Sequence, residues 1–206
     1  MTRLIPATLA VLLAVASLGV RAADTRSPEE LVRSTTDEIL ALTKKNKELY
    51  QRDHQALYRM ADERVLPYFD FRRMSQWVLG KHWRDASAAQ RDRFVVEFRN
   101  LLVRTYSTAL LSYTDQQILY LPSPARVADD DATVKTEVKQ SGGAPNIPIH
   151  YSFFKNKSGE WKVYDVTIEG VSLVTNYRSV YATKIRNEGV EALIASMATD
   201  TRERAK

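Results

Sequence analysis

The middle of the chain has the clearest helical pattern of apolar positions. It begins at Ser87, which is followed three residues later by Gln90, a capping box that satisfies free amide groups at the start of a helix. Apolar residues then recur every three or four positions, which predicts a helix over 88–113 with one continuous apolar face. The residues of that face are Phe94, Val95, Phe98, Leu101, Leu102, Thr105, Tyr106, Ala109, Leu110 and Tyr113.

Shorter helical segments precede this helix. Ser27 opens another capping box, with a proline at the first helical position, so we expect a surface helix over 28–51. A further helical stretch is expected over 53–66. Asp70 can cap a short helix with apolar residues at helical spacing, and Gly80 ends that helix.

From residue 116 the apolar pattern changes to a period of two, which is typical of strands. Four alternating runs lie between 116 and 170, and the turn sequence at 156–159 predicts a hairpin. We therefore expect an antiparallel sheet of four or five strands. In the last run the apolar residues after Val163 change face, so either a β-bulge intervenes or both faces of the sheet are covered.

After Gly170 the pattern becomes helical again, with a break expected at 187–189. The chain therefore consists of helices over 27–115, a sheet over 116–170 and helices over 171–200. This order predicts an α+β fold in which helices pack on a twisted antiparallel sheet. We find no repeat or linker that would divide it.

The first 22 residues have the pattern of a cleavable export signal. Arg3 supplies a positive charge, residues 4–20 are uncharged and mostly apolar, and a signal peptidase would cut after Ala22, with a cut after Ala23 as the alternative. The alternative is a membrane anchor, but this run is at the lower limit of about 17–25 residues for a spanning helix. A lipoprotein signal is excluded because it needs a cysteine at the cut. We expect residues 23–206 to form one soluble domain, with the bacterial periplasm as the simplest location.

Composition narrows the classes of function. The 206 residues include no cysteine, so disulfides, thiolate nucleophiles and cysteine metal sites are excluded. The net charge of +5 falls to +3 without the two arginines of the signal, and the charges are spread along the chain, a poor pattern for nucleic-acid binding. Phosphate-binding glycine motifs are missing, and the three histidines lie far apart. We expect no nucleic-acid partner, no metal and no resident cofactor.

Candidate catalytic groups are few. Ser172 lacks the second glycine of the serine-hydrolase motif and is more typical of a helix cap. Asp165 and Glu169 could pair as general acid and base in a cavity, although a salt bridge or exposed strand carboxylates explain such a pair more often.

Aromatic residues are concentrated on the elements that would form the interior. Ten tyrosines, six phenylalanines and three tryptophans fall largely on the long helix, the strands and the helix after Gly170. They could simply fill a core. Alternatively, helix and sheet do not close on one another and leave an apolar cavity with tyrosine hydroxyls near its mouth.

Several separated motifs resemble a known family. They are VLPYFDF at 65–71, VLGKHWRDAS at 78–87, LLVRTY at 101–106, GEWKVYDV at 159–166 and IEGVSLV at 168–174. In this combination, which spans nearly all of the chain after the signal, the sequence resembles the MlaC/toluene-tolerance family of periplasmic phospholipid-binding proteins.

The resemblance implies an NTF2-like sheet combined with a helical subdomain. It also implies a deep pocket that takes the acyl chains of a phospholipid while the head group stays outside. The implied partners are an outer-membrane lipoprotein complex and an inner-membrane ABC transporter that carries an MCE-domain protein.

The resulting hypothesis is a periplasmic carrier, without enzymatic activity, that moves phospholipid between the outer and inner membranes and maintains the lipid asymmetry of the outer membrane. The residues that we expect to bind the lipid are Phe98, Leu102, Tyr106, Leu110, Tyr120, Val134, Ile149, Tyr151, Trp161, Val163, Val166, Val171, Leu173 and Tyr177.

Two other classes of function remain open at this point. One is a cavity enzyme, an isomerase or dehydratase of a small hydrophobic substrate, with Asp165 and either Tyr164 or Tyr151 as its reactive groups. The other is a scaffold or adaptor whose apolar residues fill a closed core.

Overall fold

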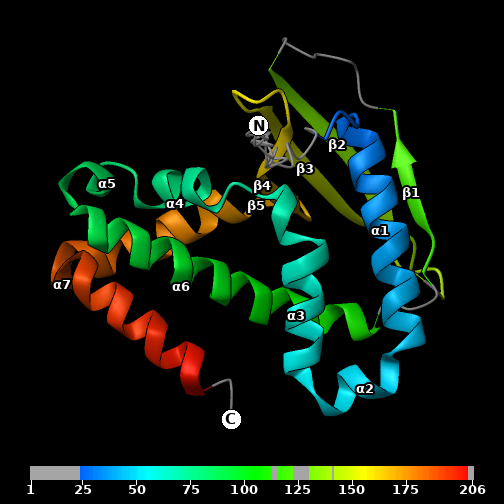
Figure 1. Ribbon diagram of the computed structural model, residues 1–206, viewed down its shortest axis with the longest axis horizontal. Coiled ribbons are helices and arrows are strands. Elements are labelled where there is room, and N and C mark those ends of the chain that lie inside the picture. Colours follow the sequence, from blue (N-terminus) through cyan, green and yellow to red (C-terminus); the bar gives the residue numbers. More distant parts are fainter. Residues whose placement is uncertain (1–23, 113–115, 123–129, 141, 204–206) are drawn as a thin grey trace, which may run out of the picture.

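The computed structural model describes residues 24–112, 116–122, 130–140 and 142–203 (Figure 1), so the predicted export signal lies outside the described residues. In chain order the elements are α1 (Pro28–Lys45), α2 (Lys47–Arg52), α3 (His54–Arg64), the 3-10 helix η1 (Leu66–Tyr68), α4 (Phe71–Leu79), α5 (His82–Asp85), α6 (Ala88–Ser107), the 3-10 helix η2 (Thr108–Ser112), β1 (Ile118–Leu121), β2 (Asp131–Val138), β3 (Ile147–Lys155), β4 (Trp161–Ile168), β5 (Val171–Ser172) and α7 (Leu173–Glu203).

The strands form one open antiparallel sheet in the order β1-β2-β3-β4-β5. Tyr120, Thr136, Ile149 and Ile168 stand opposite one another across four strands, and residues aligned in this way share one face of a sheet. We call this the inner face. Helix α1 lies across it, in front of β1 and β2, while α4 to α7 group to one side of the sheet (Figure 1). The predicted α+β fold with an antiparallel sheet is confirmed.

A β-bulge explains the lost alternation in β4. Asp165 is the partner of Ser152 and Val163 is the partner of Phe153, so Tyr164 has no partner on β3. The extra residue returns Val166 to the same face as Val163. Tyr164 packs edge-on against the ring of Trp77 on the other face, with the ring centroids 4.9 Å apart. The two explanations offered for the change of face in β4, a β-bulge and a covered outer face, therefore both hold.

Side-chain caps begin the helices where the sequence predicts them. The capping boxes at Ser27 and Ser87 both form, and the Asp70 carboxylate accepts a hydrogen bond from the backbone amide of Arg73 at the start of α4. The expected break in the last helix falls at Gly189, which has φ 85°.

Two predicted helix ends are wrong. A single helix was expected over 28–51, but α1 ends at Lys45 because the backbone of Asn46 leaves the helical region, with φ −112° and ψ 20°. The Asn46 side-chain amide donates to the carbonyl oxygen of Leu42 at 2.9 Å, a local bond that competes with helix continuation. The helix expected over 88–113 likewise ends at Ser107 and continues as η2.

Three buried clusters hold these elements together. Phe94 and Phe98 lie at the centre of a helical core between α4, α6 and α7. Leu31 of α1 and Phe153 of β3 belong to a second cluster, between α1 and the inner face. Leu57 of α3 belongs to a third, which joins α1, α2 and α3. Helix α1 is thus packed at both ends, against the sheet and against α3.

We expect Phe94→Ala to lower the free energy of unfolding by about 3–5 kcal/mol, because Phe94 is fully buried and stacks on Phe98 with a centroid distance of 5.8 Å. Val96→Ala on the same helix is the control, since Val96 is 51% exposed and its loss should change stability by about 0.5 kcal/mol or less. Urea unfolding measures both. Equal losses in the two variants would contradict the position of the helical core.

Candidate functional site

An apolar cavity of about 320 Å³ lies between α1, the α3–η1–α4 segment, α6 and the inner face of the sheet. The described residues that line it carry no charged side chain. Volumes of roughly 300–1,000 Å³ are typical of ligand sites, and space of this size admits roughly 20–30 groups as large as a water molecule. Because an apolar cavity does not hold water well, the arrangement suits an extended apolar ligand.

The structure places eight of the fourteen predicted lipid-binding residues on the cavity wall. They come from α6 and η2, from β3 and β4, and from the start of α7. These residues are Leu102, Tyr106, Leu110, Ile149, Tyr151, Val163, Val166 and Leu173.

Three of the predicted residues lie away from the cavity. Phe98 and Tyr177 pack against each other in the helical core, with ring centroids 5.3 Å apart. Phe98 lies on the side of α6, and Tyr177 on the side of α7, that faces the helical core rather than the sheet. Val171 is 53% exposed on the short edge strand β5. These three side chains are not among the residues that line the cavity. Strand and helix periodicity cannot say which neighbour covers a face.

Three others lie on the side of the sheet that faces α1 but are covered. Val134 and Trp161 are buried with Leu31 in the cluster between α1 and the sheet. The guanidinium carbon of Arg33 lies 3.8 Å from the centre of the Tyr120 ring. Helix α1 therefore occupies the space in which these side chains were expected to meet a ligand.

Sequence reasoning missed the wall contributed by the amino-terminal helices. Helix α1 is a surface helix with one buried face, and the sequence did not indicate that this face meets the cavity. Its cavity residues form two rows spaced by four, a spacing that places them on one side of a helix. The lining residues of α1 are Leu31, Val32, Thr35, Thr36, Ile39 and Leu40, and those between α3 and α4 are Ala61, Val65, Leu66, Tyr68, Phe69, Phe71 and Met74.

Two tyrosines of the wall, Tyr106 and Tyr151, stay uncharged at neutral pH. Burial raises the pKa of Tyr106 to about 12, with further contributions from the neighbouring Tyr177. Burial also raises the pKa of Tyr151 to about 12. The wall therefore carries hydroxyl groups that can accept or donate a hydrogen bond without bringing a charge into the cavity.

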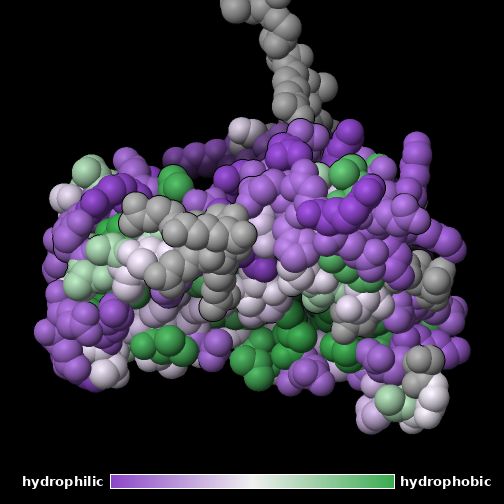
Figure 2. Space-filling view, turned by 90° about the horizontal axis from the view of Figure 1, so that it is seen from below, coloured by the Kyte–Doolittle hydropathy of each residue, from purple (hydrophilic) through white to green (hydrophobic). Residues whose placement is uncertain are grey.

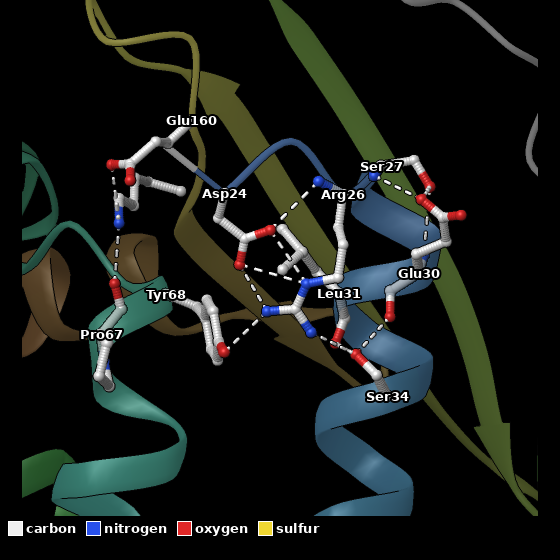
Figure 3. A network of polar contacts seen from close by, with 10 residues as sticks. Asp24, Arg26, Ser27, Glu30, Leu31, Ser34, Pro67, Tyr68 and Glu160 are labelled. Atoms are coloured by element: carbon white, nitrogen blue, oxygen red, sulfur yellow. Dashed lines mark hydrogen bonds and ion pairs between the residues drawn. The ribbon is translucent and has the colours of Figure 1, made fainter. Parts of the chain in front are cut away.

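A polar network stands beside the cavity where α1 begins (Figure 3). The Arg26 guanidinium donates to the Tyr68 hydroxyl at 2.9 Å and to the Ser34 hydroxyl at 2.7 Å. It also bonds the Asp24 carboxylate through Nε and Nη2, and the hydrogen bond to Arg26 lowers the pKa of Asp24. Of these residues Tyr68 lines the cavity, so the network fixes one wall residue to the start of α1.

The candidate acid of the enzyme hypothesis has a structural role. The Asp165 carboxylate accepts hydrogen bonds from the Ser172 hydroxyl and from the backbone amide of Val174, at the start of α7. Ser172 in turn accepts from the backbone amide of Thr175, as expected for a helix cap. Asp165 does not line the cavity, so the enzyme hypothesis gains no support.

Among the described residues, no group of three or more histidine or acidic side chains is placed to hold a metal ion. None of the described helices is both long and apolar enough to span a bilayer.

The raised pKa of Tyr151 predicts a loss of stability at high pH. The folded protein holds this proton up to about pH 12, whereas the ordinary tyrosine value is 10, so the contribution is complete below pH 10 and is lost as the pH rises through 12. Tyr151→Phe should reduce the fall in unfolding free energy between pH 9 and pH 12 by about 2 kcal/mol, measured by urea unfolding. An unchanged fall would mean that Tyr151 ionises freely and does not lie in an apolar wall.

Comparison with known proteins identifies the family. A model of the MlaC protein family matches residues 33–199. The MlaC binding protein of an intermembrane phospholipid transport system in Haemophilus influenzae is 28% identical over 173 residues, which cover 83% of this chain and 80% of that protein. The toluene tolerance protein ttg2D of Pseudomonas putida is 32% identical over 183 residues, covering 88% of this chain and 82% of that protein.

A solved structure shares the fold. The phospholipid-binding protein of Ralstonia solanacearum, solved in complex with a phospholipid, has a TM-score of 0.80 and 29% sequence identity, and the match covers 88% of this chain and 100% of that one. The resemblance found in the sequence motifs is thereby confirmed, and it agrees with the expectation of a binding protein rather than an enzyme. The chain belongs to the MlaC family.

Proposed function

We propose that this protein is a periplasmic phospholipid carrier that moves lipid between the outer and inner membranes and maintains the lipid asymmetry of the outer membrane. The observation that carries the proposal is the uncharged apolar cavity of about 320 Å³ between α1 and the sheet. The phospholipid held by a protein of the same fold supports this choice of ligand.

The physical need for such a cavity follows from the cost of exposing acyl chains to water. Each exposed methylene costs about 0.8 kcal/mol, so roughly 28 methylenes of a diacyl lipid cost on the order of 20 kcal/mol. A lipid therefore cannot cross an aqueous compartment by itself at a useful rate. The carrier covers the chains with side chains such as Leu102, Val166 and Ile149, which replace the apolar interior of the bilayer.

Transfer between a bilayer and the cavity is close to neutral, because both offer the chains an apolar surrounding. High affinity then does not trap the lipid. The chain has no nucleotide-binding motif, so the direction of transport depends on partners that bind the loaded and empty carrier with different affinity. The partners proposed are an outer-membrane lipoprotein complex and an inner-membrane ABC transporter with an MCE-domain protein.

Val166→Asp should abolish lipid binding, because it places a carboxylate in the wall of the cavity. Val171→Asp is the matched control, since Val171 lies nearby on β5 but is 53% exposed. The measurement is mass spectrometry of organic extracts from protein purified without detergent. We expect phospholipid from the wild type and from Val171→Asp, and none from Val166→Asp.

Circular dichroism and urea unfolding must show that Val166→Asp remains folded. If that variant does not fold, Tyr106→Asp, on the opposite wall, takes its place. Equal amounts of lipid in folded wall variants and the control would contradict the cavity as the lipid site, and lipid-free wild type would contradict the proposed function.

The proposed location has a separate test. Expressed in a bacterium with two membranes, the protein should be recovered from the periplasmic fraction with an amino terminus at Ala23, because residues 1–22 have the pattern of a cleaved signal. Edman sequencing or intact mass gives the result. A chain that keeps residues 1–22 and sediments with the inner membrane would indicate an anchor instead.

A further inference from the structure

The cavity has two ends that differ in polarity. Phe69 pairs with Val163, so the η1 side of the cavity meets the sheet at the row Ala132, Phe153 and Val163. Val138 lies six residues further along β2, a distance of about 20 Å in a strand. This separation is comparable with the length of an extended acyl chain, so the cavity can hold one lengthwise.

The end near η1 is polar. Tyr68 lines the cavity there, and the Arg26 guanidinium lies 5.4 Å from the centre of its ring and 2.9 Å from its hydroxyl oxygen (Figure 3). The other end is bounded by apolar side chains, namely Leu110, Ile118 and Val138. A ligand with an anionic group and long apolar chains therefore fits in one orientation only.

We propose that Arg26 binds the phosphate of the phospholipid, with the acyl chains running from Tyr68 toward Leu110, Ile118 and Val138. This assignment rests on the proposed function. The guanidinium group presents several donors in a planar fork, a geometry that matches the oxygens of a phosphate.

Asp24 holds the place of the phosphate when no lipid is bound. Its carboxylate bonds Nε of Arg26 at 3.0 Å and also bonds Nη2 of the same guanidinium. Asp24 stands two residues before Arg26, so exchanging the carboxylate for a phosphodiester requires only a local movement of the chain. One singly charged anion replaces another, and the guanidinium is never left unpaired. Asp24 and phosphate therefore compete for Arg26.

This competition gives two substitutions with opposite effects. Arg26→Gln should weaken phospholipid binding by about tenfold, because hydrogen bonds to charged groups are lost. Asp24→Asn should strengthen phospholipid binding several-fold, because it removes the competing charge. A purely structural role of the network predicts that both substitutions weaken binding.

The control is Arg33→Gln, which removes a positive charge from the same helix. Arg33 pairs with Glu29 and covers Tyr120, which does not line the cavity. We expect this variant to bind phospholipid as the wild type does.

The experiment measures equilibrium uptake from two sets of vesicles. One set contains dioleoyl phosphatidylethanolamine and phosphatidylglycerol, and the other contains dioleoyl digalactosyldiacylglycerol with dioleoylglycerol, which have the same acyl chains and no phosphate. The protein is separated by gel filtration, and the bound lipid is quantified by mass spectrometry. Uptake of dioleoylglycerol should be the same in all four proteins.

Each outcome decides the assignment. It is overturned if Arg26→Gln retains wild-type phospholipid affinity, if Arg26→Gln and Arg33→Gln lose the same amount, or if Arg26→Gln and Asp24→Asn both lose every lipid class. If any of these results is found and the wild-type protein still takes up phospholipid, only the assignment of Arg26 is overturned, and the proposed function stands. A wild type that takes up neither lipid class overturns both.

A spin-label measurement tests the orientation directly. Because the chain contains no cysteine, a single nitroxide can be attached at Thr25→Cys, beside Arg26, or at Lys139→Cys, beside Val138. Both positions are exposed. The phosphorus-31 signal of bound phospholipid should broaden with the label at 25 and not with the label at 139. The reverse result would overturn the assignment.

Discussion

The structure depends on keeping an apolar cavity open against collapse. Unfilled cavities cost about 24 cal/mol per Å³, so leaving about 320 Å³ unfilled would cost at most on the order of 8 kcal/mol. That is comparable with the whole unfolding free energy of a typical domain, about 5–15 kcal/mol. The walls must therefore be held by interactions that do not involve the cavity, and a bound apolar ligand recovers much of the penalty.

The fold supplies this support from outside the cavity. The helical core around Phe94 and Phe98 fixes α6 and α7 mainly through residues that do not line the cavity, such as Val78, Leu193 and Ile194. On the other side, α1 is held by the cluster that includes Leu57 and by an ion pair between Glu38 of α1 and Arg64 of α3. The face of the molecule seen in Figure 2 is mainly hydrophilic, with a group of apolar residues near the middle of its lower edge and smaller apolar patches elsewhere.

The chemistry of the wall suits a carrier rather than a catalyst. The described lining residues bear no charge, and the raised pKa values of Tyr106 and Tyr151 keep their hydroxyls protonated at neutral pH. Such a wall does not distinguish one acyl chain from another. The Arg26 guanidinium bonds Tyr68 at the end near η1, which is where we propose that the anionic head group binds. Binding of the chains and recognition of the head group are therefore separated in space.

Local patterns were sufficient for most of the secondary structure. Capping boxes at Ser27 and Ser87, the period of two after residue 116 and the break at Gly189 each arise from neighbouring residues, so the sequence alone contains them. The separated motifs were also sufficient to indicate the family. The bulge at Tyr164 was indicated in the sequence by the loss of alternation in β4. The sequence did not show that the bulge places Val163 and Val166 on the same face.

The sequence by itself determined which segments are helices and strands, that an unusual amount of aromatic surface exists, and which family the chain resembles. Only the tertiary structure decided which of these surfaces meet. Phe98 and Leu102 follow the same helical pattern and both pack in the helical core, yet only Leu102 also lines the cavity. The sequence placed Leu31 and Val32 on a surface helix, and the structure shows that they line the cavity where α1 packs over the sheet. The physical reason is that hydrophobic burial has no direction: a pattern shows that a face avoids water, but not whether a neighbouring element or a ligand covers it.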